Sequence, residues 1–407
     1  MSISRHLLPR RPGVIATLVA VLTAFVTALS TLLLVSTAQA AAPAQLPVRV
    51  KNNSGQSGPL YLYVLGVDLK TDKLGYVDRA GRFTPWSLPG GDDPAPAPDV
   101  SIAGPDDGAA VTLKIPRNLS GRIYFSFGQK LAFSLVADGL VQPAPWNPSD
   151  KNADTLFDWS EFTFNDAGLW LNSSQVDQFA LPHQVNVTSG DGSTDKTGDL
   201  VDGGRQKVID AIKHTKGFER TVITGDDGQV LRVLAPGKAT DAGLLAADYL
   251  DDYIAKAWKS YSGKKLTVVP FAHEPEKKFF GSSSGGKLIF TDTAGKQVAS
   301  FARPSTSDVW DCDGNLAAPN DLVVGPIART LCAALHRGTL GASTAEPVSD
   351  PESFYRTDLT NHYSAIIHAN MVDKKAYGFA FDDVTGQESL IHSGDPAEAG
   401  IILDPLS

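Results

Sequence analysis

Short runs in which apolar and polar residues alternate dominate the first half of the chain. From Val48 to about Ala180, β-branched and aromatic residues recur in short stretches that are separated by Gly, Pro, Asn and Asp. This is the pattern of strands joined by turns. Representative runs are Pro59–Leu65, Ala110–Ile115, Gly121–Phe127 and Leu131–Val136. The region is therefore predicted to be all-β.

The pattern changes near residue 188. Residues 188–198 are rich in Gly, Ser, Thr and Asp and are interpreted as a linker. Beyond them, helical periodicity is found over 204–215, 242–261 and 321–337, with strand-like runs at 265–271 and 287–290. The tail from Ala376 is strand-like again, over 376–384 and 399–406.

These changes predict a mainly β protein with an inserted α/β part. We assign residues 41–195 to a β domain that is completed by residues 374–407, and residues 196–373 to a mixed α/β domain. The first 40 residues are set apart, because a basic head with Arg5, Arg10 and Arg11 precedes an uncharged apolar run. Ala38-Gln39-Ala40 follows as a small-x-small cleavage site, so 1–40 is predicted to be a signal peptide.

Export has consequences for charge and for cysteine chemistry. Loss of the three leader arginines changes the formal net charge from −9 to −12. Such an acidic protein is a poor partner for a polyanion, so we expect no binding to nucleic acid. Cys312 and Cys332 are the only cysteines, and in an oxidising compartment they are expected to form one disulfide. The rival interpretation of the leader is a retained membrane anchor, because its apolar run is long.

The most informative stretch is Phe157–Asn165. Strict alternation places Phe162 and Phe164 on one face of a strand, and Trp159, Glu161, Thr163 and Asn165 on the other. Trp, Glu, Thr and Asn on one face could stack on a sugar ring and bond its hydroxyls. A solvent-facing strand without a ligand is the alternative.

A second carboxylate, Asp177, follows Glu161 in another strand-like run. The residues between include the turn-like Asn165–Gly168, so the two segments could lie side by side as a hairpin. Glycoside hydrolysis requires two carboxyl groups that face the same groove, one on each side of the bond to be cleaved. Apolar neighbours of Glu161 would favour the protonated form that a general acid needs, whereas Gln175 and Gln178 would give Asp177 a polar setting that suits a base.

The segment from Asn152 to His183 resembles the catalytic core of the laminaripentaose-producing β-1,3-glucanases, glycoside hydrolase family 64. The shared elements are the strand D-W-x-E-F-T-x-N at 158–165, then Trp170, then V-D-x-F-x-L-P at 176–182. Similarity continues at 121–131, 361–363, His368 and 376–384, and so spans most of the chain.

This resemblance implies a thaumatin-like β-sandwich next to an α/β domain, with a wide groove between them. It also implies inverting hydrolysis of β-1,3-glucan, with Glu161 as general acid and Asp177 as general base. Asp150, Thr163, Asn165 and Trp170 match positions that line the substrate groove. We expect a secreted, extracellular monomer that uses no cofactor and releases short oligosaccharides such as laminaripentaose.

Two other functions remain open on the residues alone. A thaumatin-like protein could bind glucan without cleaving it, although a pure binder has no need for both Glu161 and Asp177. A structural cell-surface protein is the third class. We expect no metal site, because Asp311–Asn315 resembles the start of a calcium loop but Leu322 occupies the position of its usual bidentate Glu.

Overall fold

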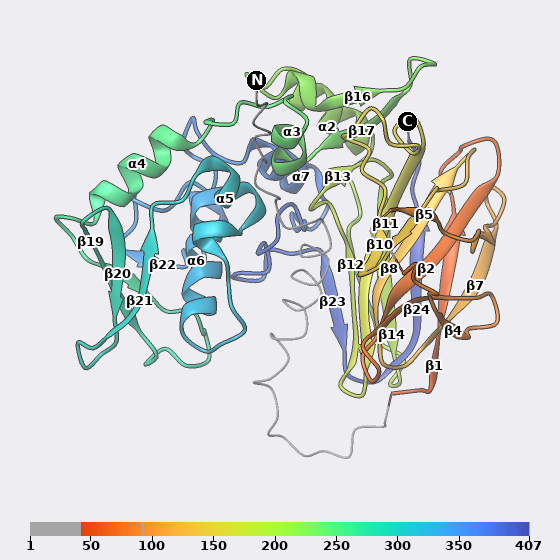
Figure 1. Ribbon diagram of the computed structural model, residues 1–407, viewed down its shortest axis with the longest axis horizontal. Coiled ribbons are helices and arrows are strands. Elements are labelled where there is room, and N and C mark those ends of the chain that lie inside the picture. Colours follow the sequence, from red (N-terminus) through yellow and green to blue (C-terminus); the bar gives the residue numbers. More distant parts are fainter. Residues whose placement is uncertain (1–41, 91–92, 407) are drawn as a thin grey trace, which may run out of the picture.

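The computed structural model describes residues 42–90 and 93–406 of the chain. The leader predicted at 1–40 lies outside these residues. Two sheets form the right-hand part of the view in Figure 1, and a helix-rich part with its own small sheet lies on the left. Strands that lie far apart in the sequence, such as β1 (Gln45–Asn52) and β24 (Pro396–Leu403), are direct neighbours.

The five-stranded sheet has the order β15-β14-β24-β1-β7. Its strands are β1 (Gln45–Asn52), β7 (Ala110–Pro116), β14 (His183–Ser189), β15 (Thr194–Thr197) and β24 (Pro396–Leu403). The eight-stranded sheet has the order β23-β12-β11-β8-β2-β3-β4, with β6 paired to β2. Its strands are β2 (Leu60–Asp68), β3 (Lys73–Val77), β4 (Phe83–Pro85), β6 (Ile102–Ala103), β8 (Leu119–Phe127), β11 (Leu156–Asn165), β12 (Gly168–Ser173) and β23 (Leu390–Ser393).

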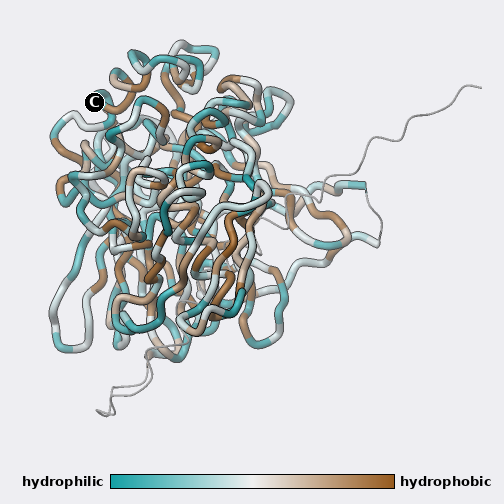
Figure 2. Tube along the Cα trace, turned by 90° about the vertical axis from the view of Figure 1, so that its left-hand side faces the viewer, coloured by the Kyte–Doolittle hydropathy of each residue, from teal (hydrophilic) through white to brown (hydrophobic). Residues whose placement is uncertain are grey.

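One apolar core joins these two sheets. Val50 of β1 and Ile401 of β24 pack in it together with Ile123 of β8 and with Phe162 and Phe164 of β11. Because side chains alternate along a strand, the residues of β8 and β11 that lie between these core positions point to the opposite face of the eight-stranded sheet. Figure 2 shows apolar positions along the packed strands and hydrophilic ones at many of the turns.

The other described residues form two three-stranded sheets, a second five-stranded sheet and the helices. The strands are β5 (Ala95–Pro96), β9 (Ser134–Val136) and β10 (Gly139–Val141); β13 (Gln178–Phe179), β16 (Val222–Thr224) and β17 (Val230–Leu234); and β18 (Leu266–Val268), β19 (Phe279–Ser284), β20 (Lys287–Thr291), β21 (Gln297–Ala302) and β22 (Ala345–Glu346). The helices are α2 (Gly204–Lys213), α3 (Pro236–Asp241), α4 (Asp251–Ser260), α5 (Thr306–Asp311), α6 (Val324–His336) and α7 (His362–Asn370), with 3-10 turns η1 (Glu219–Thr221), η2 (Gly314–Leu316) and η3 (Pro351–Ser353).

Several expectations for local structure are wrong. Residues 188–198 are no linker, because β14 and β15 pair there as a hairpin. Residues 376–384 contain no strand; the buried Asp382 carboxylate accepts the Gly378 N–H and bonds Arg337, which holds this segment in turns. The helix predicted over 242–261 begins only at Asp251, since Gly243 adopts a left-handed conformation after α3.

Candidate functional site

The face of the eight-stranded sheet that points away from the sandwich core carries the polar residues. In the registered rows across this face, Arg122 of β8 lies opposite Glu161 of β11, which lies opposite Asn172 of β12. The next row contains Ser120, Thr163 and Trp170. The alternation predicted for Phe157–Asn165 is confirmed, because Phe162 and Phe164 pack in the core on the other face.

Glu161 is hydrogen-bonded on both carboxyl oxygens. The Arg122 guanidinium donates from Nε and Nη2 to Oε1, at 3.0 and 2.9 Å, and Asn172 Nδ2 lies 3.4 Å from Oε2. Only 7% of the Glu161 side chain is exposed. The prediction of apolar neighbours for this carboxyl is therefore wrong, because its direct partners are the cation of Arg122 and the amide of Asn172.

Asp177 lies in a loop after β12, not on a strand beside Glu161. The loop is attached to the helical part, because Tyr363 of α7 donates to the Gln175 carbonyl at 2.7 Å and the Ala235 N–H donates to the Asp177 carbonyl at 3.0 Å. The expected hairpin does form from β11 and β12, but it ends before Asp177.

The carboxylate of Asp177 lies between two cations. Lys238 Nζ is 3.4 Å from Oδ1, and Arg122 Nη2 is 3.6 Å from Oδ2. Burial alone would raise the pKa of Asp177, but the charges of Lys238 and Arg122 hold it below its ordinary value. Gln175 and Gln178 do not supply the polar setting, since their side-chain amides donate to Ser173 and to the Phe157 carbonyl.

One guanidinium nitrogen thus approaches both carboxyls. Because Arg122 Nη2 is 2.9 Å from Glu161 Oε1 and 3.6 Å from Asp177 Oδ2, these two oxygens lie within about 6.5 Å of each other. Glu161 and Asp177 therefore belong to one site.

A pocket opens on the Asp177 side of this site. Residues of both parts of the molecule line it, among them Arg122, Asp177, Trp146, Trp159, Lys238 and Trp310. Lys238 lies over the Trp146 ring at 5.0 Å, and the Arg122 guanidinium lies over the Trp159 ring at 4.6 Å. A pocket lined by aromatic side chains next to paired carboxylates is suited to a carbohydrate, whose rings present C–H groups and whose edges present hydroxyls.

Comparison with known proteins identifies the family. The family model for the β-1,3-glucanases of glycoside hydrolase family 64 matches residues 44–403. Glucan endo-1,3-beta-glucosidases of Arthrobacter sp. (strain YCWD3) and Cellulosimicrobium cellulans are each 44% identical over 376 residues, which is 92% of this chain and 67% of each relative. The chain belongs to glycoside hydrolase family 64.

Solved structures of family 64 proteins have the same fold. A laminaripentaose-producing β-1,3-glucanase in complex with laminaritetraose is 48% identical, with a TM-score of 0.86 over 90% of this chain and 100% of that chain. A family 64 β-1,3-glucanase domain from Clostridium beijerinckii is 25% identical, with a TM-score of 0.74 over 89% of this chain and 98% of that one. The resemblance seen in the sequence is confirmed, and with it the class of enzyme, a glycoside hydrolase.

The four residues predicted to bind substrate occupy different places in this family 64 chain. Thr163 and Trp170 are paired in the row next to Glu161; the Thr163 hydroxyl bonds that of Ser120 at 2.7 Å, and the half-buried Trp170 ring stacks on His392 at 4.1 Å. Asn165 accepts from the Ala167 N–H in the hairpin turn. Glu161 therefore lies between Thr163 and the Asp177 pocket.

Asp150 is separated from these residues along the surface. Its carboxylate accepts the N–H groups of Ala144 and Asn152 and so organises the loop before β11. It lines a second pocket that shares Gln142 with the Asp177 pocket. The structure thus gives Asp150 a loop-forming role.

Sequence reasoning missed Arg122, Lys238 and Trp146. Alternation within Gly121–Phe127 could have placed Arg122 on the polar face of its strand, but the register of β8 against β11 is a long-range property. Lys238 reaches Asp177 from α3, 61 positions along the chain by residue number. No local pattern indicates that contact.

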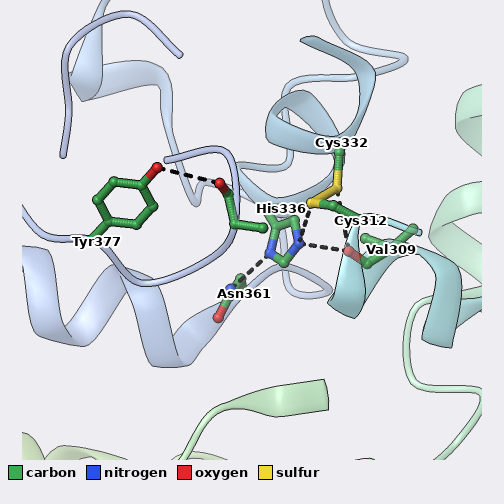
Figure 3. Close-up of a disulfide and its surroundings, with 7 residues drawn as sticks. Val309, Cys312, Cys332, His336, Asn361 and Tyr377 are labelled. Carbon is green, nitrogen blue, oxygen red and sulfur yellow. Dashed lines mark hydrogen bonds between the residues drawn. A yellow bond between two sulfur atoms is a disulfide. The ribbon is translucent and has the colours of Figure 1, made fainter. Parts of the chain in front are cut away.

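Cys312 and Cys332 form a disulfide beside this pocket (Figure 3). The neighbouring His336 is buried; its Nε2 bonds the Val309 carbonyl at 2.7 Å and its Nδ1 bonds Asn361 at 2.8 Å. Burial lowers the pKa of His336 to about 4, so the ring is neutral. The three side chains are close enough to hold a metal, but both sulfurs are joined to each other and offer no thiolate.

No helix within residues 42–90 and 93–406 is both long enough and apolar enough to span a membrane.

Asp158 connects the strand of Glu161 to the segment that follows Asp177. Its buried carboxyl accepts the N–H groups of Ala180 and Leu181 at 2.9 and 3.0 Å, and that of Trp159 at 3.0 Å. Burial raises the pKa of Asp158 from 3.8 to about 7, against the lowering effect of these donors and of Arg232. The folded protein therefore binds a proton here that the unfolded chain has lost above about pH 4.

We predict that the free energy of unfolding falls as pH rises from about 4 to about 7, because the folded state binds this proton more tightly than the unfolded chain does. Asp158→Asn resembles the neutral carboxylic acid and cannot titrate, so its free energy of unfolding should depend less steeply on pH over this range. Urea denaturation of both proteins at pH 5 and pH 8 measures the difference. Equal pH dependence of the two proteins would show that Asp158 is ionised in the folded state throughout.

Proposed function

We propose that this chain is a secreted, inverting hydrolase of β-1,3-glucan that releases short oligosaccharides, with laminaripentaose as the expected product. The observation that carries the proposal is the placement of Glu161 and Asp177 around one guanidinium, at the edge of an aromatic-lined pocket, in a family 64 chain. The solved relative named as laminaripentaose-producing supports the product.

In the proposed mechanism, Glu161 donates its proton to the glycosidic oxygen while Asp177 takes a proton from the attacking water. The water's oxygen bonds the anomeric carbon as the bond to the leaving oxygen breaks. The lowered pKa of Asp177 supports its role as a base, because the carboxylate is ionised and ready to accept. Hydrogen bonds from Arg122 and Asn172 to Glu161 would strengthen as Glu161 becomes negative, which favours the transition state over the bound substrate.

We propose that the glucan runs along the polar sheet face in a wide groove between a thaumatin-like sandwich and the α/β domain. It would cross Glu161 with Thr163, Asn165 and Trp170 on one side and the Asp177 pocket on the other. Asp150, at the second pocket, would contact a more distant sugar through the loop that it organises. The laminaritetraose held by the solved relative supports a linear β-1,3-linked ligand.

We also propose that the chain is exported after cleavage at Ala40 and acts outside the cell as a monomer. The Cys312–Cys332 disulfide supports an oxidising compartment. The division into residues 41–195 with 374–407, and 196–373, stays a prediction. In its favour, β23 and β24 both return to the sandwich sheets.

The substrate is tested by reducing-sugar release from matched polysaccharides. We predict hydrolysis of laminarin and curdlan and none of cellulose or chitin, since the paired acids act only on a chain whose linkage places the glycosidic oxygen between them. Mass spectrometry of the products should show laminaripentaose. Binding of laminarin without cleavage would favour the glucan-binding alternative, and comparable turnover of cellulose would refute the linkage preference.

The roles of the two carboxyls are tested by Glu161→Gln and Asp177→Asn. Each should lower kcat by roughly 10²–10⁴-fold, the usual contribution of one general acid or base, with glucan binding retained. An aryl leaving group, which needs little protonation, should partly restore Glu161→Gln and leave Asp177→Asn inactive, whereas azide should help only Asp177→Asn.

Asp166→Asn is the matched control, because Asp166 lies in the β11–β12 turn and is exposed. It should keep the activity of the unmodified protein. Equal rescue of both variants by the activated substrate would mean that the roles are misassigned. Full activity of Glu161→Gln would mean that another carboxyl donates the proton. Asp311 would then be the next candidate, because it also lines the pocket.

A further inference from the structure

Arg122 uses every nitrogen of its guanidinium inside the protein. Nε and Nη2 donate to Glu161 Oε1, Nη2 also approaches Asp177 Oδ2, and Nη1 donates to Gln142 Oε1 at 3.0 Å. The planar fork of arginine allows this arrangement, whereas a lysine ammonium would supply a single point of contact. The carboxyls of a β-strand and of a loop are thereby tied to one rigid group.

Packing fixes the orientation of this group. The guanidinium lies over the Trp159 ring at 4.6 Å, and only 14% of the Arg122 side chain is exposed. Tyr124, two residues along β8, donates its hydroxyl to the same Gln142 oxygen that Arg122 contacts. Burial opposes the charge of Arg122, but Tyr124, Glu161 and Asp177 outweigh it and raise the pKa of Arg122, so this residue is a permanent cation.

Carboxyls and cations alternate across the site. Glu161, Arg122, Asp177 and Lys238 follow one another in contact. Without Arg122, two buried carboxyls would face each other with Lys238 as compensation on the Asp177 side alone. Like charges at this distance disfavour each other's ionised form, and a shift of about 1 Å in a reacting group can lower a rate by about 10²-fold.

We propose that Arg122 is a positioning residue that holds the Glu161 and Asp177 carboxyls in their working separation and orientation. This proposal rests on the proposed roles of the two carboxyls in hydrolysis. Its own nitrogens are occupied by protein groups, so it acts on the reaction through the two carboxyls and not through the sugar. Lys238 completes the arrangement by contacting the other oxygen of Asp177.

The protonation of Asp177 is also influenced by titratable groups on the other elements around it. These are Tyr124 of β8, Lys238 of α3, Asp311 of α5 and Tyr363 of α7, and Glu161 of β11 faces Asp177 across the Arg122 guanidinium. All of them remain when Arg122 alone is replaced, so a change in the titration of Asp177 can be attributed to the lost guanidinium.

Two substitutions separate geometry from charge. Arg122→Gln removes both the cation and the fork, and it should lower kcat by about 10²-fold with little change in KM. The acidic limb of the kcat/KM profile should move to higher pH, because Asp177 loses one of its two cations. Arg122→Lys keeps the charge and should leave this limb near its original position while kcat stays low.

A third variant, Arg117→Gln, removes a guanidinium that pairs with Asp166 at the far end of the same sheet. It should change neither kcat nor the pH profile. Thermal unfolding of all three variants reports any general loss of stability. A purely structural role of Arg122 would lower the melting temperature without moving the acidic limb and would overturn the proposal.

A readout without turnover separates this proposal from the proposed function. Carbon-13 NMR titration of the Asp177 carboxyl, assigned with Asp177→Asn, should show a higher pKa in Arg122→Gln than in the unmodified protein. If the unmodified protein cleaves laminarin but Arg122→Gln keeps its rate and its titration, the positioning role fails and the function stands. If laminarin is not cleaved but the titration shifts, the function fails and the coupling of Arg122 to Asp177 stands. If Arg122→Gln does not fold, Arg122→Lys must still show reduced kcat with an unmoved limb, and full activity of that variant overturns the proposal.

Discussion

The contact of the Arg122 guanidinium with the Glu161 and Asp177 carboxyls is the interaction on which the site depends. Carboxyls removed from water need compensating charge, and a buried pair that loses one partner is strongly destabilised, typically by about 3–5 kcal/mol. Arg122 supplies this compensation to two carboxyls at once, at 2.9 and 3.6 Å. Its surroundings of Trp159, Tyr124 and Gln142 keep the fork in one orientation.

The sandwich and the helical part each contribute one side of this arrangement. Glu161 and Arg122 lie on paired strands of the eight-stranded sheet, whose opposite face is packed in the core. Asp177 lies in a loop that is bonded to α7 and to the residue before α3, and Lys238 of α3 reaches it from there. The carboxyl of Asp158 holds the chain beyond Asp177 to the strand of Glu161, because it accepts the N–H groups of Ala180 and Leu181.

The sequence predicted those features that depend on neighbouring residues, and it did not predict contacts between segments that lie far apart along the chain. Alternation along Phe157–Asn165 is local, and it correctly separated Glu161 from Phe162 and Phe164. The contact of Glu161 with Arg122 depends on the register of β8 against β11, and that of Asp177 with Lys238 on packing between the two parts, so neither has a local signal. Residues 376–384 have the composition of a strand, but the buried Asp382 draws the segment into turns through Arg337 and Gly378. The roles proposed for Glu161 and Asp177 come from the family resemblance, because a pair of acids in the sequence could also arise by chance.

The distance between the carboxyls leads to the most direct measurement. Retaining glycosidases place their carboxyls about 5–5.5 Å apart and inverting ones about 6.5–9.5 Å, the larger gap admitting a water molecule. Arg122 Nη2 is 2.9 Å from one oxygen of Glu161 and 3.6 Å from one oxygen of Asp177, so these two oxygens lie within about 6.5 Å of each other. The configuration of the product therefore decides whether Asp177 acts as a base or as a nucleophile. Proton NMR during the first minutes of laminarin hydrolysis should show the α-anomer of the new reducing end before mutarotation. Appearance of the β-anomer first would contradict the account, because Asp177 would then bond the sugar itself.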